Sequence, residues 1–164
     1  MNTKFRLLAA ALAVASLTPV AQAASTVNNS FTVSVNLSSR CIATNSGATT
    51  LDFGTYTAFQ AGAQTPAAPV TLTFDCTRGL APVSVAFDVV NGTAAGVGVL
   101  AGLQYSLAAS AATIVAGTAA STATIGTADA VSYSVNGSMP ASQAGTCGTA
   151  SCAASHTRTL IVTY

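Results

Sequence analysis

Four cysteines and a single histidine are the residues of this sequence best suited to chemistry. They are Cys41, Cys76, Cys147, Cys152 and His156. Four cysteines allow three disulfide pairings. Cys147 and Cys152 are five positions apart with small residues between them, which favours a closed local loop. That loop would leave Cys41 to pair with Cys76.

Metal binding is the competing interpretation of the same residues. Cys147, Cys152 and His156 could offer two thiolates and an imidazole. The spacing fits no standard zinc motif, however, and no fourth ligand stands nearby. We therefore predict two disulfides, and we expect no metal and no cofactor.

Few residues could support acid–base catalysis, because the chain has one histidine and no glutamate. A hydrolytic triad would need His156 beside a serine and an aspartate. The four aspartates are Asp52, Asp75, Asp88 and Asp129. The last three lie within or beside predicted strands on their polar face, where a solvated carboxylate is expected. We predict a protein that is not an enzyme and has no small-molecule substrate.

A glycine-containing segment, residues 96–101, formally matches the dinucleotide-binding pattern G-x-G-x-x-A. A dinucleotide site would also need a following crossover helix and an acidic residue about 20 positions further on. Neither is present, so we predict a flexible glycine turn here.

Charge is scarce in the whole chain of 164 residues. Five residues are Lys or Arg and four are Asp or Glu, which makes 5% of the sequence. So few charges cannot build the basic stripe that neutralises nucleic-acid phosphates. Disorder driven by charge is also excluded, because net charge is near zero and 51% of the residues are hydrophobic.

The N-terminus has the three parts of a secretory signal peptide. Lys4 and Arg6 precede an apolar stretch over residues 7–17, and Ala21-Gln22-Ala23 supplies the small-x-small cleavage pattern. We predict cleavage after Ala23 and export to the periplasm, then to the cell surface or the medium. Such an oxidising compartment favours disulfides.

The elements that would position these residues are strands. Apolar and polar residues alternate with a period of two, which is typical of half-buried strands. The segments are 27–37, 70–76, 83–89, 103–107, 131–135 and 160–164. Asn91-Gly92 and Asn136-Gly137 are expected to be turns that end two of them. Residues 58–69 and 138–155 are expected to be loops, and the whole favours an antiparallel β-sandwich.

The ordered set of segments resembles the spore coat U domain family, the pilins of archaic chaperone–usher pili. The resemblance covers essentially all of the mature chain. It rests on the alternating segment 27–37 before Cys41, Leu51-Asp52-Phe53-Gly54, segment 70–76 with Cys76, residues 82–89, Tyr105, residues 131–140 and the closing 159–164. The Cys147/Cys152 pair departs from the pattern associated with the family.

The resemblance implies an immunoglobulin-like β-sandwich that lacks its last strand and is completed by a strand of a neighbouring subunit. Residues 24–37 would be the donor strand and residues 38–164 the pilin domain. The donor residues would be Val27, Phe31, Val33, Val35 and Leu37. A periplasmic chaperone would pair with Leu160, Val162 and Tyr164 before an outer-membrane usher exchanges it for the neighbouring subunit.

The function implied is that of a structural pilus subunit (fimbrium) serving adhesion or biofilm formation. The alternative is that residues 24–37 form the first strand of a complete β-sandwich. In that case the protein would be a monomeric secreted coat or matrix protein. A fibre-tip adhesin fits less well, because a tip subunit needs no donor strand and usually carries a second, binding domain.

Overall fold

The computed structural model describes residues 26–45, 49–90 and 94–164. The predicted signal peptide and the turn predicted at Asn91-Gly92 lie outside these residues. The chain divides into two units, residues 1–36 and 37–164, which are described separately. In the second unit the strands are β1 Cys41–Ala43, β2 Val70–Cys76, β3 Ser84–Phe87, β4 Val97–Leu100, β5 Leu103–Ala109, β6 Thr113–Val115, β7 Asp129–Ser138 and β8 Leu160–Thr163.

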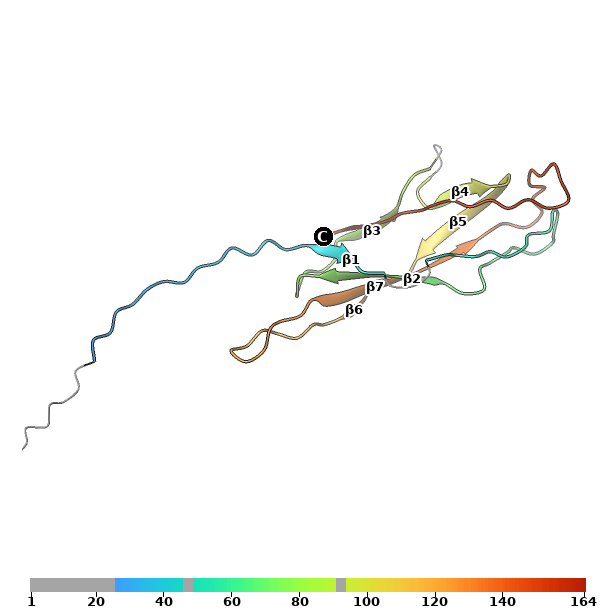
Figure 1. Ribbon diagram of the computed structural model, residues 1–164. Coiled ribbons are helices and arrows are strands. Elements are labelled where there is room, and N and C mark those ends of the chain that lie inside the picture. Colours follow the sequence, from blue (N-terminus) through green and yellow to red (C-terminus); the bar gives the residue numbers. More distant parts are fainter. Residues whose placement is uncertain (1–25, 46–48, 91–93) are drawn as a thin grey trace, which may run out of the picture. The chain divides into compact units, whose positions relative to one another are not determined.

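The larger sheet has the order β1-β2-β7-β5-β4, and β6 also pairs with β7 (Figure 1). The smaller sheet consists of β3 and β8. Every pairing is antiparallel, the larger sheet is curled, and no helix occurs in the described part of the chain. The predicted all-β, antiparallel architecture is confirmed at this level.

β7 is the central strand because both of its edges are paired. β2 lies along one edge, while β5 and β6 follow one another along the other. Its side chains alternate between buried and partly exposed, as the period-two pattern predicts. Val131, Tyr133 and Val135 lie on the buried face and are at most 6% exposed.

The core lies between the two sheets. Cys76, Val131 and Tyr133 form a buried cluster in the larger sheet. Leu160 and Val162 of β8 pack against this cluster. The last strand therefore contributes to the core although it belongs to the smaller sheet.

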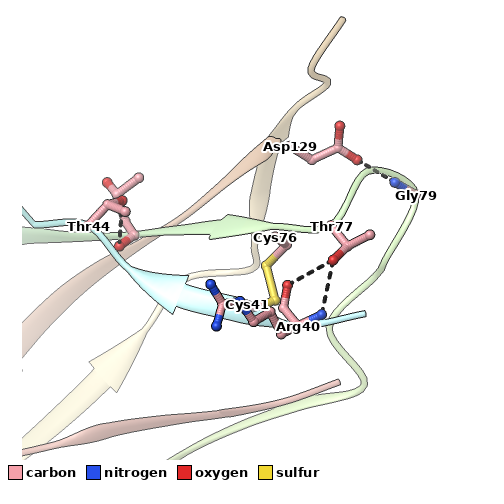
Figure 2. Close-up of a disulfide and its surroundings, with 8 residues drawn as sticks. Arg40, Cys41, Thr44, Cys76, Thr77, Gly79 and Asp129 are labelled. Atoms are coloured by element: carbon pink, nitrogen blue, oxygen red, sulfur yellow. Dashed lines mark hydrogen bonds between the residues drawn. A yellow bond between two sulfur atoms is a disulfide. The ribbon is translucent and has the colours of Figure 1, made fainter. Parts of the chain in front are cut away.

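Both predicted disulfides are present, Cys41–Cys76 and Cys147–Cys152. Cys41 and Cys76 lie directly opposite each other in the β1–β2 ladder, with their Cα atoms 4.0 Å apart (Figure 2). Side chains approach most closely at such a non-hydrogen-bonded position of an antiparallel pair. This disulfide fastens the three-residue strand β1 to β2, the neighbour of the central strand β7.

Two predicted turns are wrong. The segment 96–101 contains β4, in which Gly98 lies opposite Tyr105. A side chain at Gly98 would collide with the Tyr105 ring, so packing explains this glycine better than a flexible turn does. At Asn136-Gly137 the strand β7 continues to Ser138, because β5 pairs with it up to that residue. The Phe53 ring occupies the space where a side chain of residue 137 would lie, which explains the glycine.

Candidate functional site

The last strand, β8, has an unpaired edge. Among the described residues β8 pairs only with β3. The Asp88 N–H donates to the Thr159 carbonyl oxygen at 3.0 Å, which identifies this pair as hydrogen-bonded. In an antiparallel ladder such pairs alternate, so the backbone groups of Leu160 and Val162 point away from β3. A free edge of this kind can accept a further strand.

The side chains along this edge are apolar and only partly covered. Leu160 and Val162 face the core cluster and are half-buried. Val85, the residue opposite Val162 on β3, is 37% exposed. Tyr164, at the end of the chain, is 47% exposed. An added strand would therefore find both backbone partners and apolar side chains at this edge.

Within the described ranges, β1 also has an unpaired edge, and this edge borders the same core cluster. The Thr44 N–H donates to the Thr73 carbonyl oxygen at 2.9 Å, so the backbone of Cys41 and Ala43 faces away from β2. The side chain of Cys41 packs against the cluster that Leu160 and Val162 also contact. The core is thus bordered by one free edge from each sheet.

Arg158, two residues before β8, fixes the beginning of that strand. Its Nε–H donates to Asp88 Oδ1 at 2.9 Å, and its other N–H groups donate to the carbonyl oxygens of Asp88 and Val97 and to the Tyr105 hydroxyl. The Arg158 side chain is 9% exposed. Two of these four hydrogen bonds go to Asp88, which follows β3, and the other two go to β4 and β5, so Arg158 ties the smaller sheet to β4 and β5.

The Asp88 carboxylate is part of this arrangement and is not the solvated group expected from the sequence. Burial by itself would raise the pKa of Asp88. Hydrogen bonds from Arg158 and from the Thr159 backbone outweigh that effect, so the pKa lies below its ordinary value. Asp88 is charged at neutral pH and neutralises Arg158.

Asp129 is also wrongly predicted as solvated, because it is 7% exposed. Its two carboxylate oxygens accept the N–H groups of Gly79, at 2.8 Å, and Gly117, at 2.7 Å. These two hydrogen bonds lower the pKa of Asp129. The residue connects the turn after β2 to the segment after β6, and sequence alternation alone does not reveal such a role.

His156 lies beside Tyr105, whose hydroxyl is 3.0 Å from His156 Nδ1. No group of three or more metal-ligating side chains occurs in the described ranges. Cys147 and Cys152 are joined to each other instead. The histidine thus extends the polar contacts around Arg158.

Residues 26–37 contain the predicted donor side chains, and all five are exposed. The exposed fractions are 90% for Val27, 87% for Phe31, 83% for Val33, 89% for Val35 and 78% for Leu37. The segment forms no strand, although its alternation predicts one. The described part of the chain provides no strand partner for it.

No helix in the described ranges is long and apolar enough to cross a lipid bilayer. Two disulfides are typical of proteins exported to an oxidising compartment. Searches against protein-family models, curated proteins and solved structures found no match.

Proposed function

We propose that the protein is a structural subunit of a surface pilus, assembled by the chaperone–usher route through donor-strand exchange and serving adhesion or biofilm formation. The observation that carries the proposal is a pair of complementary features. β8 has a free edge beside the core, whereas residues 26–37 are strand-like in pattern, apolar on one parity and exposed.

The strand order supports this proposal. A constant-type immunoglobulin domain has strands A, B, E and D in one sheet and C, F and G in the other. The order β1-β2-β7-β5 corresponds to A-B-E-D, and β3-β8 corresponds to C-F. In this correspondence the domain lacks strand G, whose place is beside β8. A donor strand from a neighbouring subunit would supply it.

Burial of residues 27–37 in the groove of a neighbouring subunit would be energetically favourable. Each of the five apolar side chains would gain roughly 1.5–3 kcal/mol on burial. The gross gain is on the order of 7–15 kcal/mol, before the cost of ordering the segment. A periplasmic chaperone would first cover the edge at Leu160, Val162 and Tyr164, because an open edge promotes aggregation. An outer-membrane usher would then exchange the chaperone for the next subunit.

Deleting residues 24–37 tests the proposal. We expect the shortened subunit to fold with its chaperone, as measured by circular dichroism of the purified complex. We also expect no ladder of polymers in unheated gel samples, because no donor strand is left.

If the segment is instead the subunit's own first strand, its deletion removes core side chains and the product is unfolded. That result, or a wild-type protein that stays monomeric at high concentration without a chaperone, would favour the monomeric coat or matrix protein instead.

A further inference from the structure

Phe59 is an exposed aromatic residue in a strained backbone conformation. The residue is 72% exposed, and its φ angle is +63°. A bulky residue rarely adopts this left-handed conformation, which persists only where the surroundings impose it. Strained residues of this kind cluster at functional sites.

Two loops impose the conformation by binding each other. The Phe59 N–H donates to the Gln143 carbonyl oxygen at 2.8 Å, and the Ser142 N–H donates to the Gln60 carbonyl oxygen at 2.8 Å. Ser142 also has a positive φ, of +60°. The Tyr56 hydroxyl adds a hydrogen bond to the Pro140 carbonyl oxygen at 2.7 Å. The exposed ring is therefore presented by a rigid support.

Phe59 lies on the side of the domain from which the chain enters β8. Gln143, its hydrogen-bond partner, exchanges two hydrogen bonds with the backbone of Gln104. The next residue, Tyr105, binds Arg158, two residues before β8. We call this side of the domain the Phe59 end. In Figure 1 the C-terminus and β1 lie toward the opposite end.

An open hollow of about 490 Å³ lies beside Arg40, at that opposite end. It is bordered by β1, β2 and the segment 116–128. Small residues of that segment line it together with the charged residues Arg40, Asp75 and Arg78. Asp129 holds the turn at Gly79 on one side of this region (Figure 2). The volume falls in the range that accommodates small organic molecules, so it is ample for one aromatic ring.

The chain between the donor segment and this hollow is short. Only Ser38 and Ser39 separate Leu37 from Arg40. Arg40 is fixed by hydrogen bonds of 3.0 and 2.9 Å that join its backbone to Thr77 (Figure 2). Three extended residues span about 10 Å. A protein that binds the segment as far as Leu37 must therefore lie next to the Arg40 hollow.

We infer that Phe59 of one subunit inserts into the Arg40 hollow of the subunit whose donor strand it receives. This contact rests on the proposed function. A strand that completes an antiparallel sheet runs opposite to β8, so the donor passes Leu160 of the acceptor with its Leu37 end directed toward the Phe59 end. The Phe59 end of one copy then faces the Arg40 hollow of the next, and the contact sets the angle between them.

Photocrosslinking of the assembled polymer tests this contact. Benzoylphenylalanine is placed at position 59 and, as a control, at Ile161, which is 49% exposed on the outer face of β8. We expect position 59 to crosslink to the peptide 116–128 of the adjacent copy in the polymer, and not in the chaperone-bound subunit. Ala120→Arg should abolish this crosslink, whereas Thr122→Arg, outside the hollow, should retain it.

The polymer ladder of each variant is scored separately from its crosslinks. A ladder without the crosslink, or with a crosslink from position 59 to another region, overturns the contact but leaves the proposed function intact. The absence of any ladder from the wild-type protein overturns the proposed function, and the contact with it.

Discussion

The N-terminal segment 26–37 and strand β7 have the same sequence pattern and opposite surroundings. Val131 and Val135 in β7 are 0% and 6% exposed, whereas Val33 and Val35 are 83% and 89% exposed. β7 is paired along both edges, while the segment has no strand partner among the described residues. Alternation thus indicates that a segment can form a half-buried strand, but it does not indicate which sheet, or which molecule, will cover it.

Matched substitutions at Val131 and Val33 test this comparison most strongly. Val131→Asp buries a carboxylate without a partner and should destabilise the domain by at least about 4 kcal/mol, a large part of a typical total stability. We expect no protease-resistant subunit in periplasmic extracts. Val33→Asp should leave the chaperone-bound subunit folded but unable to polymerise. Equal loss of folded protein from both variants would show that Val33 belongs to the subunit's own core.

Within the segment, polymerisation should be most sensitive to substitution of Phe31, because this residue has the largest side chain among the apolar, odd-numbered positions. Phe31→Arg would place an unpaired charge in an apolar site and should abolish polymerisation. Thr32→Arg, on the polar parity, should polymerise nearly as well as the wild type. Unheated gel samples measure both effects. If both variants form the same ladder of polymers, the apolar, odd-numbered residues of the segment are not the ones that a neighbouring subunit binds.

The edge strand β8 provides the corresponding test on the acceptor side. Val162 faces the core cluster, whereas Ile161 lies on the outer face of the same strand. Val162→Asp should prevent recovery of a chaperone complex by co-purification, and Ile161→Asp should retain it. Co-purification of the Val162 variant at wild-type levels would show that the chaperone binds elsewhere.

The two disulfides should differ in their effects on stability. On the loop-entropy model, Cys41–Cys76 stabilises by roughly 3–4 kcal/mol and Cys147–Cys152 by about 2 kcal/mol. Cys76 is also buried, at 1% exposure. Denaturant unfolding of variants with Ala at both cysteines of one pair should reproduce this order. The reverse order would mean that the exposed loop carries more of the fold than its contacts indicate.

Acid should weaken the body of the domain and not the N-terminal segment. Hydrogen bonds from Gly79 and Gly117 lower the pKa of Asp129, at the start of β7, whereas residues 26–37 contain no ionisable side chain. Stability from Asp129 is therefore complete above its unfolded pKa of about 3.9 and is lost as the pH falls through the lower folded pKa. Asp129→Asn should flatten the stability profile below pH about 4, measured by urea unfolding.

Long alternating segments made part of the fold predictable. β2 and β7 each extend over seven or more residues, so their patterns could be recognised. β1 and β6 have three residues each, too few to show a period of two. The turn predicted at Asn136-Gly137 failed because local turn preference was outweighed by the pairing of β5 with a continuing strand.

The candidate site was predictable only in its apolar residues. Alternation identified Leu160 and Val162 as a face of the last strand. Arg158 was missed, because its partners Asp88 and Tyr105 are 70 and 53 positions away in sequence. Phe59 was missed for a similar reason, since its left-handed conformation depends on a second loop more than 80 residues further on.

The short junction at Arg40 has a mechanical consequence. A pulling force on the N-terminal segment would enter the domain at β1, a three-residue strand that few hydrogen bonds would hold against peeling. The Cys41–Cys76 bridge lies one residue beyond Arg40 and transfers the load covalently to β2. β2 is paired with β7 along its full seven residues, so tension is resisted by the longest ladder in the molecule.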